Sequence, residues 1–427
     1  MWVRLRYSNL FLGAIWVIII CECNGFRLFK VEDDLYKAVY LAVTAVILLI
    51  CLLNKDILCV CKAYGKFTYW YIIFIFIFLI FEYRFTSHIY GNRQVLYDFV
   101  NYIKHYFLIT LAMPLLYIFT IRNNVKSLLN SVLLLVTITL GLILLHSLFY
   151  DWWEIDFLNV SMYTKIISRN NRMRIWDLSS LEGLAIIYGS YCLLYEKRKK
   201  VMYLLQTAIC IAALVYVEQT RMMLISLATC ILFMIIMKRR KTAEGLLTTG
   251  ALILLLGIIG GFYVIPKLFE SFAINSVNGA STLDRLRELR VAFYILRNKG
   301  ILGLGMINKN VQRHLFSNVT LEDIGLIGHM VQTGIWSVPL FIFPMFRMAL
   351  ILVHGIKEKF RIFLSTVYIY LLITSISLFI LDSPRILMWP FCLALFEFYN
   401  KKCFEEYDEG IISEYIMNEE CNEKNSK

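Results

Sequence analysis

Twelve apolar runs, each close to the length of a membrane-spanning helix, follow one another along the 427-residue chain. A helix needs about 20 predominantly apolar residues to cross the roughly 30 Å of hydrocarbon in a bilayer, so these runs predict membrane spans. They lie at 9–23, 35–53, 67–82, 105–121, 128–149, 178–195, 201–217, 222–237, 246–265, 328–353, 362–381 and 386–399. We therefore predict an all-α, polytopic integral membrane helical bundle with about twelve transmembrane helices, forming a single membrane domain over residues 1–427.

Composition agrees with a chain whose solvent is lipid. Charged residues make up 17% of the sequence and hydrophobic residues 59%, whereas an ordinary soluble domain holds about 25% charged residues. The net charge of +12 does not indicate nucleic-acid binding, because cytoplasmic loops of membrane proteins collect Lys and Arg for topological reasons. The eleven cysteines lie mostly in apolar runs, so we expect neither a zinc site nor a disulfide framework.

Charge also predicts the orientation of the spans. The connections after the second, fourth, sixth, eighth and tenth runs are short and rich in Lys and Arg, and so are the N-terminus and the start of the C-terminal tail. The positive-inside rule places such segments in the cytoplasm. We therefore expect both termini inside, with 400–427 as a cytoplasmic tail and the first run retained as a span. Two long connections, 150–177 and 266–327, then face outward, and we expect short interfacial helices in them.

The second outer loop contains a basic stretch, "STLDRLRELRVAFYILRNKGILGLG". Its basic residues are Arg285, Arg287, Arg290, Arg297 and Lys299. Beside them, apolar residues recur at helical spacing: Leu286, Leu289, Phe293 and Leu296. A helix with an apolar stripe next to a basic one is typical of a segment that lies flat on a membrane surface. Its arginines fit two roles, anchoring to anionic headgroups or binding a phosphate-bearing lipid substrate through the guanidinium fork.

Other candidate residues lie near this helix and in the first outer loop. Gly303 and Gly305 allow a tight turn and a close backbone approach after the helix. Asp323 stands near the start of the tenth run, where it fits either a catalytic carboxylate or the N-cap of the next helix. Arg172 belongs to an arginine cluster in the first outer loop, and Arg221 lies at the mouth of the eighth run, where it could snorkel or complete a basic pocket.

Three stretches follow a distinctive order. They are "TRMMLISL" at the start of the eighth run, "DRLRELRVAFYILRNKGILGLG" in the second outer loop and "LEDIGLIGHMVQTGIWSVPLF" at the start of the tenth run. They resemble, in turn, the Ser/Thr-Arg start of a span, the R-x-x-x-W/A…N-P-x-G-x-G segment and the S-D-x-G-x-x-G…G start of a span in the O-antigen and capsular-polysaccharide polymerases, relatives of the O-antigen ligases. Lys299 replaces the usual Pro. The resemblance covers residues 160–345 best, and the first five runs match in hydropathy alone.

Two spacings agree with the loop motifs of these polymerases. Arg172 and Gly183 form R-x10-G, and Arg287 and Gly303 form R-x15-G. The ligases carry a His before the span that follows the large loop, and Asp323 takes that place here. This departure favours a polymerase over a ligase and leaves the identity of the general base open.

The resemblance implies a metal-independent glycosyltransferase at the outer face of the bacterial cytoplasmic membrane. Such a polymerase joins undecaprenyl-pyrophosphate-linked oligosaccharide repeats into an O-antigen, capsule or exopolysaccharide. It uses no cofactor, and the sequence holds neither a DxD motif nor a convincing His/Asp metal set. Beyond the lipid bilayer and the lipid-linked substrate, chain-length regulators and flippases are candidate partners.

Carried onto this chain, the family pattern assigns Arg287 and Asp323 to catalysis, with Asp323 orienting or deprotonating the acceptor hydroxyl. Substrate binding would fall to Arg172, Arg221, Arg285, Arg290, Gly183, Gly303 and Gly305. Three alternatives stay open: a ligase-type glycan transferase, a polysaccharide flippase or other transporter, and a non-enzymatic assembly scaffold. A transporter predicts charged residues along the spans, whereas these runs hold few, Arg347 being one exception.

Overall fold

The computed structural model describes residues 2–22, 33–91, 96–158, 167–169, 172–174, 180–239, 279–298, 301–316, 319–321, 324–353, 358–383 and 385–401. The N-terminal half contains α1 (Trp2–Glu22), α2 (Asp33–Leu53), α3 (Lys55–Tyr64), α4 (Lys66–Tyr90), α5 (Leu96–Ile103), η3 (Lys104–Leu111), α6 (Ala112–Arg122) and α7 (Val125–Trp153). Then follow β1 (Ile167–Arg169), β2 (Arg172–Arg174), α9 (Glu182–Tyr195), α10 (Lys200–Ala213), η4 (Leu214–Glu218) and α11 (Arg221–Arg239). The C-terminal part contains α14 (Gly279–Asn298), α15 (Lys309–Leu315), α16 (Gly325–Thr333), η6 (Gly334–Trp336), η7 (Val338–Ile342), α17 (Phe343–Val353), α18 (Glu358–Ser375) and a last helix over 388–401.

Long apolar helices support a multi-pass membrane protein. Every predicted run contains helix except the ninth, 246–265, which lies outside the described residues. Within the described part of the chain, five helices are long and apolar enough to cross a membrane, or up to seven if each bent pair forms one span. That range is smaller than the predicted twelve, because some runs form short helices. α9, with 14 residues, is only about 21 Å long.

The two bends have local causes. α2 and α3 meet at 92° around Asn54, whose side-chain oxygen accepts hydrogen bonds from the backbone N–H groups of Asp56 and Ile57 and so begins a new helix. The second bend, 112°, separates η6 from the pair η7 and α17. Here Gly334 adopts φ +57° and Pro339 lacks an N–H group, so the chain cannot continue as one straight helix.

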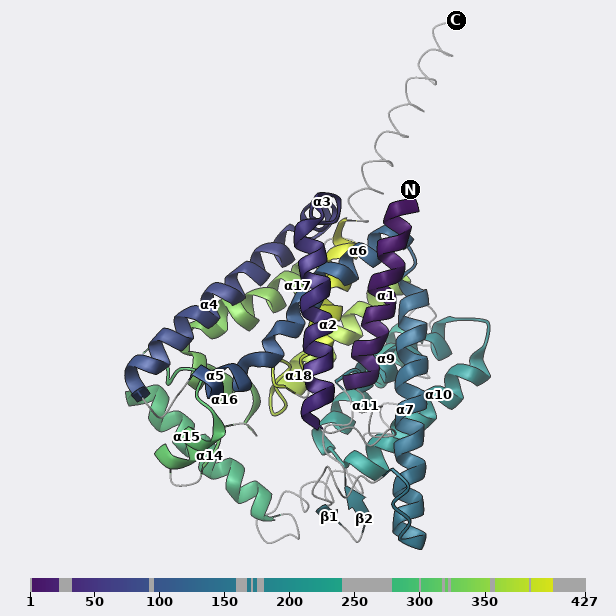
Figure 1. Cartoon of the computed structure of the whole chain (residues 1–427). Coiled ribbons are helices and arrows are strands. Elements are labelled where there is room, and N and C mark those ends of the chain that lie inside the picture. Colours follow the sequence, from purple (N-terminus) through teal and green to yellow (C-terminus); the bar gives the residue numbers. More distant parts are fainter. Residues whose placement is uncertain are drawn as a thin grey trace, which may run out of the picture.

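The ends of the bundle differ in what they carry (Figure 1). The start of α1 and the short helix α3 lie at one end, whereas β1, β2, α14 and α15 lie at the other. The described parts of the two long loops therefore share one end of the bundle, as the alternating charge pattern predicts. Which end faces the cytoplasm stays a prediction, and the tail beyond residue 401 lies outside the described residues.

The two long loops fold differently from each other. The second contains the helices α14 and α15, which confirms helical structure there. In the first, residues 150–153 complete α7, and the described residues further along form an antiparallel pair of short strands, with Ile167 opposite Arg174 and Arg169 opposite Arg172. The expected interfacial helix is wrong at these strand residues, and the remainder of the loop between them and residue 158 lies outside the described residues. Only two residues, both Asn, separate the strands, a loop length and composition typical of tight hairpins.

The core gathers around α6, α9 and the last helix, which are buried along most of their length. The hydroxyl of Tyr71 donates a hydrogen bond to the carbonyl of Leu340 at 2.6 Å and accepts one from Trp389 Nε1 at 3.1 Å. These bonds tie α4, η7 and the last helix together. Nearby, the Arg347 guanidinium donates to both carboxylate oxygens of Glu397. The charge that the sequence places inside the tenth run is thus paired across the bundle.

Candidate functional site

Buried ionisable groups gather where α9, η4, α11 and the end of α18 meet. We call Glu182, Glu218, Tyr370 and Arg385 the Glu182 cluster. Glu182 is 0% exposed, and Glu218 and Tyr370 are also buried. Tyr370 lies within electrostatic reach of both carboxyl groups and of Arg385. Because α9, α11 and α18 pack against one another, side chains that are far apart in the sequence converge here.

Two carboxyl groups of this cluster lie against each other. Thr220 Oγ1 donates a hydrogen bond to Glu218 Oε1 at 2.9 Å, and the Glu182 carboxyl group, which is fully buried, faces Glu218. Two carboxylates that interact in a low-dielectric interior repel each other when both are ionised. Such a pair is therefore a candidate for proton transfer to or from a neighbouring group.

The backbone around Glu218 is irregular. η4 is a single π-helical turn, and the next residue, Gln219, adopts φ +55° while its N–H group donates to the Leu214 carbonyl at 2.8 Å. Such turns occur preferentially at functional sites, because the extra residue redirects the side chains that follow. In this protein the π turn ends at Glu218 and places it opposite Glu182.

Gly183 allows α18 to approach α9 closely. A Cβ atom at this position would stand 2.2 Å from the Tyr370 hydroxyl oxygen, so any side chain there would displace Tyr370. The sequence predicts a substrate-binding role for Gly183. In the structure its visible effect is on packing, since it keeps the Tyr370 hydroxyl beside the carboxyl pair.

Two arginines are associated with the carboxyl pair, one within the cluster and one close to it in the sequence. Arg385 forms an ion pair with Asp382, Nη1 to Oδ2 at 3.7 Å, and its side chain is 24% exposed. Arg221, the first residue of α11, is half-buried and follows Glu218 by three positions. β2, which contains Arg172, packs against η4. Three predicted site residues, Arg172, Gly183 and Arg221, therefore belong to elements that meet at the Glu182 cluster, although the side chain of Arg172 lies outside the described part.

A second group of predicted residues forms a backbone turn after α14. Gly303 and Gly305 have φ values of +72° and +82°, which favour glycine. The N–H of Leu304 donates to the Val331 carbonyl at 2.9 Å, and the N–H of Gly305 donates to the Gln332 carbonyl at 2.8 Å. The predicted tight turn and close approach are confirmed, and the partner is the protein's own backbone at the end of α16.

Side chains from α4 and α5 hold this turn. Glu82 Oε2 accepts a hydrogen bond from the N–H of Met306 at 2.9 Å. The Tyr90 hydroxyl donates to the Leu304 carbonyl at 2.9 Å, and the Tyr102 hydroxyl donates to Gln332 Oε1 at 3.0 Å. These hydrogen bonds attach both the turn and the end of α16 that it contacts to α4 and α5.

Replacing Gly303 with alanine is expected to destabilise the protein by about 1–3 kcal/mol, the cost of a non-glycine residue in strained backbone. The added Cβ would also lie 2.6 Å from the Val331 carbonyl oxygen. The detergent-solubilised protein is heated and then passed over a size-exclusion column. The measurement is the temperature at which half of it no longer elutes as a single species. Gly13→Ala in α1 is the control, because nothing lies within 4 Å of its added Cβ. Equal stability of the two variants would contradict the structural role of the turn.

The arginines of α14 lie on an open helix face. Ala292 and Ile295 are buried against neighbouring segments, including α16, whereas Phe293 is 61% exposed. The Arg287 side chain is 66% exposed, and its Nη1 lies 3.5 Å from Asp284 Oδ1. Arg290 is also exposed. An open face that mixes aromatic and basic side chains fits a helix seated in the membrane interface.

Arg285 and Asp323 are the remaining predicted site residues. Arg285 is half-buried, and its Nε atom is buried without a hydrogen-bond partner among the described residues. Asp323, the predicted catalytic carboxylate, lies outside the described residues. Gly325, two residues later, packs closely against the end of α18, since a Cβ there would lie 2.6 Å from the Ser375 carbonyl oxygen.

The chain between α18 and the last helix lies between the Glu182 cluster and α16, the helix that contacts the turn after α14. Phe379 stacks on the ring of His329 in α16, with 4.3 Å between ring centroids. A few residues later, Arg385, which belongs to the Glu182 cluster, pairs with Asp382. The turn after α14 and the cluster at α9 are therefore held against one short segment.

Sequence reasoning missed Glu182, Glu218, Tyr370 and Arg385. A signal for the two glutamates exists, because carboxylates at the edges of apolar spans are costly and are more often functional than decorative. The polar stretch "LDSPR" between the last two runs could likewise have indicated Arg385.

No protein-family model matches the chain, and neither the curated proteins nor the solved structures contain a match. Among the described residues, no three His, Cys, Asp or Glu side chains lie together in a way that could hold a metal ion.

Proposed function

We propose that this protein is a polysaccharide polymerase that joins undecaprenyl-pyrophosphate-linked oligosaccharide repeats at the outer face of the bacterial cytoplasmic membrane. One observation carries the proposal: a buried carboxyl pair has half-buried arginines with it, Arg385 within the Glu182 cluster and Arg221 three residues after Glu218. Cations at such a place suit a phosphate-bearing lipid, and carboxyl groups suit a reaction that moves a proton.

The reaction would be a glycosyl transfer. The bond between the anomeric carbon of the growing chain and its pyrophosphate breaks, and the acceptor hydroxyl forms the new glycosidic bond while it loses its proton. Arg221 and Arg385 would stabilise the negative charge that develops on the leaving pyrophosphate, and Arg172 would join them from β2. The general base would be Asp323, as the family pattern suggests, or the Glu182–Glu218 pair if the acceptor reaches it.

α14 would bind the same substrate from the membrane surface. Its exposed Arg287 and Arg290 stand beside exposed apolar side chains, so the helix offers phosphate contacts at the depth of lipid headgroups. Gly303 and Gly305 would support this helix by fixing the turn that follows it. In this proposal the glycines act through backbone geometry and the arginines make the contacts.

The direct test is synthesis with defined components. Purified protein in lipid vesicles would receive a chemically defined undecaprenyl-pyrophosphate-linked repeat and no other acceptor. We expect a ladder of products that differ by one repeat, formed equally in the presence of a metal chelator. If the protein transfers glycan only after a separate acceptor is added, it is a ligase. If no glycosidic bond forms under either condition, the proposal is wrong.

One observation favours a second candidate, a transporter of lipid-linked glycan or another anionic substrate. A buried pair of carboxyl groups inside a membrane bundle, such as Glu182 and Glu218, is typical of proton-coupled transporters. The same vesicles would separate the candidates, because a transporter moves the labelled substrate across the bilayer without lengthening it.

Arg287 tests whether α14 contacts substrate or only the membrane. We expect both Arg287→Ala and Arg287→Lys to lower polymer formation by about tenfold or more, the equivalent of one charged hydrogen bond. Lysine keeps the positive charge that anchors the helix but loses the two-point fork. The measurement is chain length in cells with normal protein levels, with the exposed Arg297→Ala as control. Full-length chains in both Arg287 variants would refute the assignment.

A further inference from the structure

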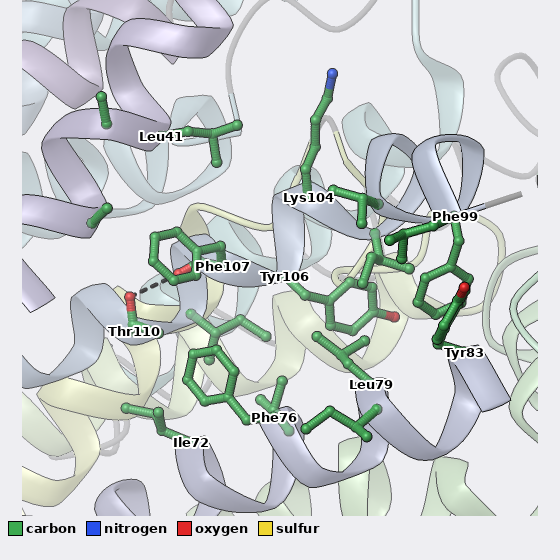
Figure 2. A pocket seen from close by; sticks show the side chains of 18 residues that line it. Leu41, Ile72, Phe76, Leu79, Tyr83, Phe99, Lys104, Tyr106, Phe107 and Thr110 are labelled. Atoms are coloured by element: carbon green, nitrogen blue, oxygen red, sulfur yellow. Dashed lines mark hydrogen bonds between the residues drawn. The ribbon is translucent and has the colours of Figure 1, made fainter.

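A groove of about 610 Å3 lies between α2, α4, α5 and η3 (Figure 2). Its walls are aliphatic and aromatic, with Ile72, Phe76 and Leu79 from α4, Phe99 from α5 and Phe107 from η3 among the lining residues. Its volume falls within the range of roughly 300–1,000 Å3 that is usual for ligand sites. None of the residues proposed above for phosphate or proton chemistry lines it.

The groove opens toward the membrane hydrocarbon. Three of its lining side chains, Ile80, Leu96 and Val100, are 66%, 53% and 49% exposed. Next to the groove on α4, Ile77 is 62% exposed. In a bundle that spans a bilayer, apolar side chains exposed to this degree contact lipid. The molecules that can enter from this side are therefore hydrocarbon chains already dissolved in the membrane.

The polar groups of the groove are few and unequal. Thr110 donates its hydroxyl to the Phe107 carbonyl at 2.8 Å, so this wall group is already satisfied. Among the described lining residues, Lys104 carries the charge, and it lies at the rim with its ammonium group directed away from the rings (Figure 2). Lys104 also donates to Asn101 Oδ1 on α5. An apolar channel with a cation at its rim matches a long hydrocarbon chain that ends in an anionic group.

One wall joins the groove to the turn after α14. η3 contributes Lys104, Tyr106 and Phe107 to the groove, whereas His105, between Lys104 and Tyr106, lies within electrostatic reach of His329 in α16. Tyr102, in the last turn of α5, donates to Gln332 beside the glycine turn. A chain in the groove would therefore end near the segment that links α14 to the Glu182 cluster.

We propose that this groove binds the polyisoprenyl chain of the lipid-linked donor, with the phosphate end of the chain at the rim near Lys104. The proposal rests on the proposed function, since that function supplies a lipid whose phosphate must reach the arginines. A single apolar chain fits one groove lined by rings and branched side chains. A bulk phospholipid brings two chains joined through glycerol and, in the zwitterionic case, no net charge for Lys104.

The test uses the full-length protein in phosphatidylcholine nanodiscs and a polyisoprenyl phosphate that carries a photoreactive group on its chain. After irradiation, the labelled peptides are identified by mass spectrometry. We expect labels on segments 72–83 and 96–110, and displacement by unlabelled polyisoprenyl phosphate. Labels elsewhere would overturn the proposal, because the polyisoprenyl chain would then bind outside the groove. Equal displacement by phosphatidylglycerol would also overturn it, because the groove would then accept any anionic lipid.

Two neighbouring residues of α2 provide matched variants. Ala45→Phe fills the groove, whereas Val46→Phe adds bulk to a 57% exposed position beside it that does not line the groove. We expect Ala45→Phe to lower labelling by about tenfold or more and Val46→Phe to leave it unchanged. Lys104→Gln should lower labelling, and Lys104→Arg should retain it. Because the wild-type labelling pattern is decisive by itself, an Ala45→Phe protein that fails to fold leaves the proposal refutable.

Labelling needs neither sugar nor turnover, so this experiment fails separately from the proposed function. Labelled groove segments together with no glycan synthesis would refute the polymerase function and support the lipid site. Conversely, normal polymer from a folded Ala45→Phe protein would refute the role of the groove in binding the donor and support the polymerase function.

Discussion

Replacing Arg385 with alanine is expected to lower the rate of glycan transfer by about 10²–10³-fold, the loss seen when one preorganised donor is removed from a charged transition state. The expectation rests on where Arg385 lies. It is partly buried, it pairs with Asp382 at 3.7 Å, and it interacts with Tyr370 beside two buried carboxyl groups. A guanidinium that is 24% exposed in such surroundings can offer its planar fork to a pyrophosphate.

The measurement is the initial rate of sugar transfer by purified protein from a lipid-linked repeat. Arg385→Lys should recover part of the rate, because it restores the charge without the two-point geometry. Arg313→Ala is the control, since Arg313 is an exposed arginine of α15, which lies at the end of the bundle that carries α14 and the two strands. A rate for Arg385→Ala within about twofold of wild type would contradict the role, because a lost donor costs far more.

Features that depend on local sequence could be predicted. Run length predicts helices because the bilayer sets the length of a span, and the predicted runs in the described residues are helical. The turn after α14 was likewise predictable, because Gly303 and Gly305 supply backbone conformations that other residues avoid. In both cases the physical constraint acts within a few residues, so the sequence records it directly.

Features that depend on tertiary packing could not be predicted. Glu182 and Glu218 meet only because α9 packs against α10, whose continuation η4 ends at Glu218, and no periodicity reports such a pairing. Helical periodicity places Leu286 and Phe293 on one stripe of α14 but does not say what that stripe faces. The structure leaves both exposed and buries the smaller Ala292, because a small side chain allows closer helix packing.

The ion pair between Arg347 and Glu397 is expected to be the most costly polar contact to break inside the bundle. Arg347 Nη2 donates to Glu397 Oε2 at 2.9 Å, and Nε donates to the other oxygen, so the carboxylate is held at two points. The guanidinium also lies 4.9 Å from the centroid of the Phe67 ring. We expect Arg347→Met to destabilise the protein by about 3–5 kcal/mol, because it leaves Glu397 buried without its counterion.

The double variant Arg347→Met/Glu397→Leu separates the cost of an unpaired charge from the value of the pair. We expect it to regain most of the lost stability, since apolar groups of similar volume replace a buried ion pair at little net cost. Lys126→Met is the matched control, because its partner Glu196 is 35% exposed and a surface pair contributes only about 0–1 kcal/mol. The measurement is the resistance of each variant to unfolding by a denaturing detergent, which ranks the variants by stability. If Arg347→Met is no weaker than Lys126→Met, the buried carboxylate has found another partner or a proton, and the pair is not what holds the last helix against α17.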